Sequence, residues 1–239
     1  MGRRHIVTAL AVLLLLGSGC QGLTSDRPTV TPASVPSTNG STTTDVTQLV
    51  EHHRQALRNE SHTTTVTLTV TYPNGSVARR TDTFVIGSDD TYLYERETVG
   101  PYPATLDNRS VWQNDTHEVR REGDTVTVQR GSGVDGTSLS QYLERLLGAF
   151  DLTAEPTRTG YRLTGSAERA QRVPLPALLV DHRNATADVL LREDVLRSVA
   201  VVLQADRYET DETVGVEISV TADDVGATDP TRPTWAGEA

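Results

Sequence analysis

The stretch His62-Thr63-Thr64-Thr65-Val66-Thr67-Leu68-Thr69-Val70-Thr71-Tyr72 decides the fold. Its residues alternate with a period of two, so one side of an extended chain carries Thr64, Val66, Leu68, Val70 and Tyr72 and the other side carries only threonine. This alternation is typical of a strand with one buried and one solvent-facing side. Pro73-Asn74-Gly75-Ser76 follows directly. An Asn-Gly pair in that position predicts a turn into a second antiparallel strand, which ends near Ile86.

Runs of the same kind continue along the chain. They predict further antiparallel strands at residues 91–98, 110–114, 117–121, 125–130, 161–165, 187–192, 195–205 and 213–221. Turn residues such as Glu122-Gly123-Asp124 separate neighbouring strands. The last ten residues, 230–239, read as a tail that Trp235 pins by packing.

Three segments predict helices, near residues 45–58, 139–150 and 173–181. In the second, apolar residues recur at i, i+3 and i+4 from Leu139 to Phe150, and so wide a stripe needs a surface to cover. In the third, Pro174 suits a first helical turn, whereas Pro176 limits where the helix can start.

Together these elements predict an α+β fold for residues 45–239, taken as a single domain. We expect one large curved antiparallel sheet, an incomplete barrel, with the helices packed on its concave face. A hydrophobic ligand would then lie between sheet and helices. The residues expected to line that space are Val66, Leu68, Val70, Leu143, Leu146, Phe150, Val199, Val201, Val216 and Ile218.

The N-terminal residues have the order of a secretory signal: Arg3 and Arg4, then the apolar run 6–16, then small residues up to Cys20. The apolar run is too short to cross a hydrocarbon core of about 30 Å comfortably. Residues 1–19 therefore predict a signal peptide. Residues 20–44, which are rich in Pro, Ser and Thr and poor in large apolar residues, predict a disordered, lipid-anchored linker.

Cys20 is the expected site of lipidation. It is the only cysteine, so it cannot form a disulfide within the chain. The residues before it resemble a lipobox, except that Gly17 occupies the usual aliphatic position; the alternative is an unmodified signal remnant. Arg3 and Arg4 resemble a twin-arginine export motif, with general secretion as the alternative route. Either route places the protein outside the cytoplasm, and lipidation at Cys20 would anchor it to the outer face of the cell membrane.

Charge and asparagine usage point to the same location. The chain has no lysine and carries 32 acidic residues against 22 arginines, a net charge of −10 that suits high salt and is similar to haloarchaeal exported proteins. No basic patch is apparent, which argues against nucleic acid as a partner. Each asparagine begins a glycosylation sequon, although Asn74 also suits a turn and Asn59 a helix end. The expected glycosylation sites are Asn39, Asn59, Asn74, Asn108, Asn114 and Asn184.

The sequence carries no recognisable catalytic or metal-binding motif. Its six histidines include no i, i+4 pair, and no Gly-x-Ser-x-Gly occurs. Carboxylate pairs such as Asp89-Asp90 and Asp223-Asp224 lack the alternating pattern of a calcium loop. We therefore expect no catalytic residue, no metal and no cofactor.

The order of helix, consecutive strands, central helix and further strands resembles the lipoprotein-carrier (LolA/LolB-like) fold. The chain also resembles haloarchaeal lipoproteins of unknown function, through His52-His53-Arg54-Gln55-Ala56-Leu57, the threonine-rich strand 63–71, and Pro233-Thr234-Trp235-Ala236-Gly237-Glu238-Ala239. These resemblances imply a non-enzymatic surface lipoprotein that binds a hydrophobic ligand, either a lipid or an acylated protein. The alternative is a surface scaffold or interaction module with a filled core, and a hollow interior would distinguish the two.

Overall fold

The computed structural model describes residues 44–89, 91–102, 108–131, 137–210 and 212–237. The chain divides into residues 1–31 and 32–239, and every described residue belongs to the second part. The expected signal peptide, almost the whole linker, Arg3, Arg4, Cys20 and Asn39 lie outside the described residues. Within the described ranges, the helices are all too short or too polar to cross a membrane.

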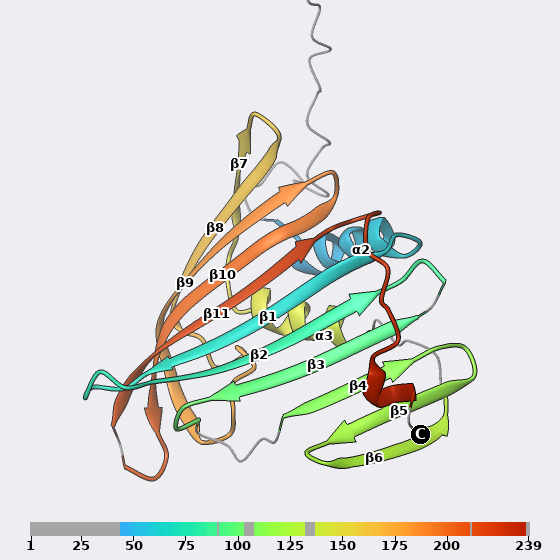
Figure 1. Ribbon diagram of the computed structural model, residues 1–239. Helices are drawn as coiled ribbons and strands as arrows, with labels where there is room; N and C mark the ends of the chain where they lie inside the picture. Colours follow the sequence, from blue (N-terminus) through green and yellow to red (C-terminus); the bar gives the residue numbers. More distant parts are fainter. Residues whose placement is uncertain (1–43, 90, 103–107, 132–136, 211, 238–239) are drawn as a thin grey trace, which may run out of the picture. The chain divides into compact units, whose positions relative to one another are not determined.

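Eleven antiparallel strands form one open sheet (Figure 1). In chain order they are β1 His62–Thr71, β2 Val77–Ile86, β3 Tyr92–Val99, β4 Arg109–Gln113, β5 His117–Glu122, β6 Thr125–Arg130, β7 Thr153–Thr157, β8 Gly160–Arg169, β9 Leu179–Arg192, β10 Val195–Arg207 and β11 Thr213–Asp223. Across the sheet the order is β6-β5-β4-β3-β2-β1-β11-β10-β9-β8-β7. The predicted antiparallel sheet is confirmed. β7 was not predicted, and β8 and β9 are longer than expected.

The sheet consists of two meanders that meet in its middle. One runs outward from β1 to the edge strand β6, and the other runs inward from the opposite edge strand β7 to β11. The segment between them contains α3 (Thr137–Leu147), which therefore lies on the path from one edge of the sheet to the other. The first and last strands pair along almost their full length, from Thr63 opposite Asp223 to Thr71 opposite Gly215.

An apolar side chain of β1 is in register with apolar side chains of four other strands, and together they form one row across the sheet. Val66 is paired with Val220 of β11, which is paired with Val199 of β10, then Val189 of β9 and Leu163 of β8. All five side chains are buried in one core cluster. Residues in register share a face, so this row marks the inner face of the sheet.

Two helices cover this inner face. α2 (Val46–Leu57) begins at Asp45, whose carboxylate accepts hydrogen bonds from the backbone N–H groups of Thr47 and Gln48 at 3.0 and 3.2 Å. Leu49 of α2 and Leu146 of α3 are fully buried in the same cluster as the strand residues. Figure 1 shows both helices on the same side of the sheet.

The helix expected near residues 173–181 is absent from the described chain, and that prediction was wrong. The segment forms turns and irregular structure, and Leu179 already begins β9. Val173 and Leu175 each precede a proline, and the proline ring disfavours helical φ and ψ in the residue before it. Two such residues within one turn prevent a helix from starting. The second predicted helix also ends earlier than expected, at Leu147.

The C-terminal segment packs on the opposite, outer face of β4 and β5. It ends in the short helix α4 (Thr234–Gly237), which Figure 1 shows in front of these strands. Trp235 packs with Trp112, Val119 and Ala236 in a small second cluster, and the Arg121 guanidinium lies 5.3 Å from the Trp235 ring centre. The expected pinning of the tail by Trp235 is confirmed, and the packed tail covers the outer face of these two strands.

Candidate functional site

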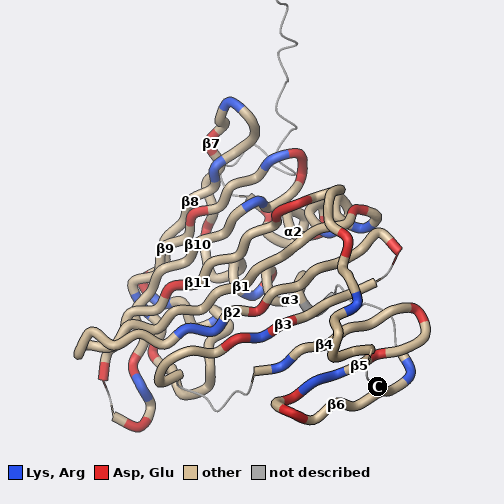
Figure 2. The backbone as a smooth tube through the Cα atoms, viewed as in Figure 1, with Lys and Arg blue, Asp and Glu red and all other residues tan. Residues whose placement is uncertain are grey.

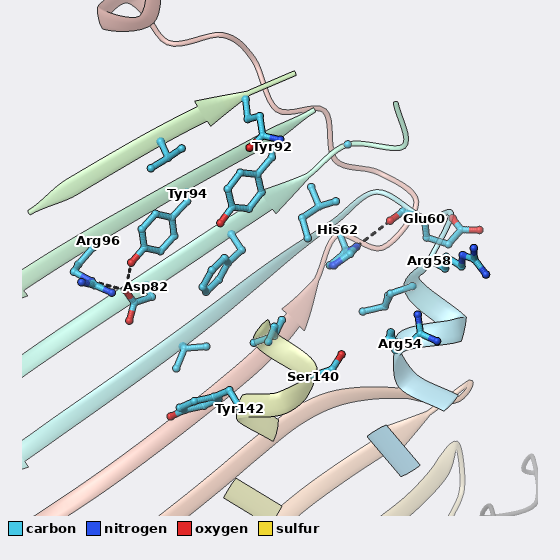
Figure 3. Close-up of a pocket in the computed structure, with 18 of the residues that line it drawn as sticks. Arg54, Arg58, Glu60, His62, Asp82, Tyr92, Tyr94, Arg96, Ser140 and Tyr142 are labelled. Carbon is cyan, nitrogen blue, oxygen red and sulfur yellow. Dashed lines mark hydrogen bonds and ion pairs between the residues drawn. The ribbon is translucent and has the colours of Figure 1, made fainter. Parts of the chain in front are cut away.

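A pocket of about 890 Å³ lies over the inner face of β2 to β5. The C-terminal end of α2 and the beginning of α3 complete its walls (Figure 3). Its volume falls in the range of small-molecule sites, which is roughly 300–1,000 Å³. This pocket is the candidate site.

Strand register arranges the inner face beneath the pocket in three rows that run from β2 to β5. The first is a charged row, the second begins with two aromatic rings, and the third mixes apolar and polar side chains. In order, the rows are Asp82, Arg96, Arg109, Glu122; then Phe84, Tyr94, Val111, Arg120; then Ile86, Tyr92, Gln113, Glu118. Hydrophobic and charged side chains therefore lie side by side on the same face.

An aromatic wall forms the centre of the pocket. The Phe84 ring centre lies 5.0 Å from that of Tyr94 and 6.4 Å from that of Tyr92. Tyr142 of α3 also lines the pocket, from the helix side in Figure 3. Burial raises the pKa of Tyr92 and Tyr94 far above the ordinary value and raises the pKa of Tyr142 to about 12. At neutral pH these tyrosines are uncharged.

A buried carboxylate organises the charged row. Asp82, with its side chain only 4% exposed, accepts hydrogen bonds from the Tyr94 hydroxyl at 2.6 Å, Arg80 Nε at 2.6 Å and Arg96 Nε at 2.8 Å. Each oxygen is engaged, Oδ1 by Tyr94 and Arg96 and Oδ2 by Arg80. Asp82 therefore fixes two arginines at the edge of the pocket.

The β4–β5 side holds hydrogen-bond donors with incomplete partners. Arg120 Nη2 donates to Glu118 at 2.9 Å, and Gln129 Nε2 donates to the same Glu118 oxygen at 2.7 Å. Arg109 Nε lies 3.5 Å from Glu122 without forming a hydrogen bond. Within the described ranges, no acceptor is bonded to Arg109 Nε, Arg120 Nε or the Gln113 side-chain amide nitrogen.

Histidines occupy the end of the pocket nearest α2. His53 Nδ1 accepts a hydrogen bond from the backbone N–H of Leu196 at 3.2 Å, and burial lowers the pKa of His53 to about 4. His62 Nδ1 lies 2.9 Å from the Glu60 carbonyl oxygen, and burial lowers the pKa of His62 as well. Both rings are neutral at pH 7, so the positive charge of the pocket comes from arginine alone.

The pocket has the opposite charge balance to the whole chain. Among the described residues that line it, six are arginine and three are acidic, namely Glu60, Asp82 and Glu118. Figure 2 shows arginine positions on each of β2, β3, β4 and β5. β1, the neighbour of β2, carries no Arg, Lys, Asp or Glu. This local excess of cations in a chain of net charge −10 was not predicted.

The residues expected to line a hydrophobic space are brought together, but most of them fill a core. All ten, including Leu143, Leu146 and Phe150, belong to one buried cluster. Of these ten, Val66 alone also lines the pocket. The open space lies further toward β5, over residues that were not on the predicted list.

The sequons within the described residues lie at the surface. Asn59, Asn74, Asn108 and Asn184 are exposed, and Asn114 is half-buried. The Asn74 Oδ1 accepts from Ser76 and the Asn114 Oδ1 from Thr116 and His117, so both side chains stabilise turns. Asn59 lies at the rim of the pocket itself.

Metal binding has no support in the described part of the chain, which contains no group of three or more His, Cys, Asp or Glu side chains placed to hold an ion. The pocket can instead present apolar and aromatic surface together with fixed guanidinium groups. Such a combination suits an amphipathic molecule, whose apolar part contacts the rings and whose polar part contacts the arginines.

The sequence matches no family model and no curated protein sequence. Solved structures with some likeness include LprF from Mycobacterium bovis, at 14% identity and a TM-score of 0.35, over 79% of this chain and 96% of that one. They also include the LolA superfamily protein NE2245 from Nitrosomonas europaea, at 8% identity and a TM-score of 0.27, over 80% and 96%. A DUF1329 family protein from Desulfovibrio piger is similar at 10% identity and a TM-score of 0.29, over 80% and 95%. The likeness is loose, and no function is transferred from these proteins.

Proposed function

We propose that this protein is a non-enzymatic binding protein that holds an amphipathic ligand, a lipid or the acyl chain of an acylated protein, in the pocket between β2–β5 and the two helices. It acts outside the cytoplasm, anchored by lipid through Cys20. The observation that carries the proposal is the open pocket of about 890 Å³ with the Phe84–Tyr92–Tyr94 wall. Aromatic surface that lines a pocket gains free energy when apolar ligand surface covers it.

One observation favours the second candidate, a scaffold or interaction module. The interior beneath the apolar row is closely filled, since Val70, Val201, Leu146 and Ile218 are all fully buried. A scaffold would use that core for stability alone, and the pocket would stay unoccupied. Ligand binding at the pocket separates the two candidates.

The binding test uses an uncharged probe, the methyl ester of a pyrene-labelled fatty acid. We expect saturable binding by the wild type and about tenfold weaker binding by Ile86→Trp, because the larger side chain takes up space at the pocket wall. The measurement is a fluorescence titration, with thermal unfolding followed in parallel to show that the variant is folded.

Val85→Trp is the matched control. Val85 adjoins Ile86 on β2 but faces the other side of the sheet, and it does not line the pocket. Its affinity for the ester should equal that of the wild type. If the wild type fails to bind the ester at all, the scaffold candidate replaces the binding function.

Anchoring is tested separately by Cys20→Ser. Because Cys20 is the only thiol in the chain, the variant cannot receive a thioether-linked lipid. We expect it to appear in the medium or to accumulate as an uncut precursor, whereas the wild type sediments with membranes. Immunoblots of both fractions measure this, and identical fractionation of the two proteins would rule out the anchor.

A further inference from the structure

We propose that the β4–β5 side of the pocket is an oxyanion site, in which Arg109, Gln113 and Arg120 bind the carboxylate or phosphate head group of an amphiphilic ligand. The inference rests on the proposed function, because it assigns the polar end of the same ligand. Its observations are the unsatisfied donors, their common face and the local charge.

The first observation concerns hydrogen bonding. Gln113 is only 4% exposed, and its amide nitrogen has no acceptor among the described residues. A buried donor left unpaired destabilises the fold, so native chains seldom retain one without a use. The Nε atoms of Arg109 and Arg120 are unpaired in the same part of the chain. All three atoms are donors, and none of them has an acceptor among the described residues.

The second observation is that the three donor side chains lie close together on the inner face of the sheet. Arg109 and Gln113 lie on either side of Val111 along β4, and Arg120 of β5 is paired directly with Val111. The three donors therefore surround one apolar side chain on the inner face, and Tyr94 of β3 borders it on the fourth side. A head group above Val111 would be within reach of all three side chains once the Gln113 amide rotates about its terminal torsion, which has a broad range.

The third observation is charge. Arg80 and Arg96 share the carboxylate of Asp82, so the charged row is partly neutralised at its β2–β3 end. Near Val111 each arginine has one acid neighbour: Glu118 accepts from Arg120 Nη2 and from Gln129, and Glu122, which is 55% exposed, lies 3.5 Å from Arg109. These pairs leave the Nε atoms of both arginines and the Gln113 amide nitrogen without an acceptor among the described residues, and the pocket lining carries six arginines against three acids. Such a lining favours an anion, and arginine is well suited to the flat geometry of carboxylate and phosphate.

The test compares the pyrene-labelled fatty acid with its methyl ester at pH 8 and fixed salt. We expect the wild type to bind the acid about tenfold more tightly than the ester, since charge-assisted hydrogen bonds are made only by the acid. Arg109→Gln and Arg120→Gln should each weaken binding of the acid by about tenfold and leave the ester unchanged. Gln113→Leu should weaken binding of the acid by a smaller factor and leave binding of the ester unchanged.

Arg121→Gln is the matched control, because it removes the same charge from the adjacent residue of β5, whose side chain lies on the outer face against Trp235. It should bind the acid as the wild type does. Equal affinity for acid and ester, or equal weakening by Arg120→Gln and Arg121→Gln, would overturn the oxyanion site. If the wild type binds neither the acid nor the ester, the proposed function itself is overturned, so the two failures are distinguishable.

A final experiment distinguishes the head group of an amphiphile from free phosphate as the source of the anion. Inorganic phosphate alone is added, and thermal unfolding of wild type and Arg120→Gln is recorded. No stabilisation by phosphate, together with preference for the acid probe, supports a head group as the occupant. A phosphate-dependent rise in the wild-type midpoint that Arg120→Gln removes would support the oxyanion site and reject the amphiphile as its source.

Discussion

Asp82→Ala is expected to lower the free energy of unfolding by about 3 kcal/mol or more, as is usual when one partner of a buried ion pair is removed. The variant leaves Arg80 and Arg96 facing each other without the carboxylate, and it leaves the Tyr94 hydroxyl without its acceptor. The two arginines are 23% and 22% exposed, so water relieves part of their repulsion but not all of it. Urea unfolding at pH 7 measures the loss.

Asp188→Ala is the control for that experiment. Asp188 also pairs with an arginine across two strands, Arg162 of β8, but both side chains are well exposed, at 44% and 58%. Exposed pairs of this kind contribute little to stability, because water screens both charges. Similar losses for Asp82→Ala and Asp188→Ala would contradict the view that Asp82 holds the charged row together.

The free energy of unfolding is expected to fall by about 2 kcal/mol between pH 7.5 and pH 5 because of His53 alone. Burial lowers the pKa of His53 from 6.5 to about 4 in the folded protein. As the pH drops through 6.5, the unfolded chain takes up a proton that the folded chain does not, so acid favours unfolding. His62, whose pKa is also lowered by burial, acts in the same direction.

His53→Gln tests this assignment, because glutamine does not titrate and its carbonyl oxygen offers the Leu196 N–H an acceptor in place of His53 Nδ1. Urea midpoints at the two pH values should differ less in this variant than in the wild type. His52→Gln, a substitution at the exposed neighbour, should keep the full wild-type dependence. An undiminished pH effect in His53→Gln would show that other groups are responsible.

The central part of the fold could be predicted because one face of its strands is apolar throughout. In β1 and β11 every inward residue from Val66 to Val70 and from Val214 to Val220 is apolar, so the period of two is visible without knowledge of the neighbours. β7 could not be recognised, since Thr-Ala-Glu-Pro-Thr has no apolar face and contains a proline. Its assignment depends on its partner β8.

The site was missed because its strands carry charged residues on the inner face. In β2 the inward positions hold Arg80, Asp82, Phe84 and Ile86, so hydrophobicity does not separate the two sides. The position of the predicted Asn-Gly turn is enough to show which residues of β2 face inward. Register counted across that turn pairs Thr71 with Val77 and therefore Val66 with Asp82, which places a carboxylate on the core side of the sheet. An inward acid in turn requires arginine neighbours.

The pairing of β1 with β11 has a consequence for how the chain is completed during synthesis. β1 lies near the beginning of the domain and β11 near its end, so one side of β1 has no partner until the last strand has been made. Contacts so distant in sequence form slowly, and a strand that waits with one open side can pair with another chain. A chain interrupted before residue 213 would keep the sheet divided into two separate halves. Such a fragment is therefore expected to aggregate, even though it would contain the whole β2–β5 pocket floor.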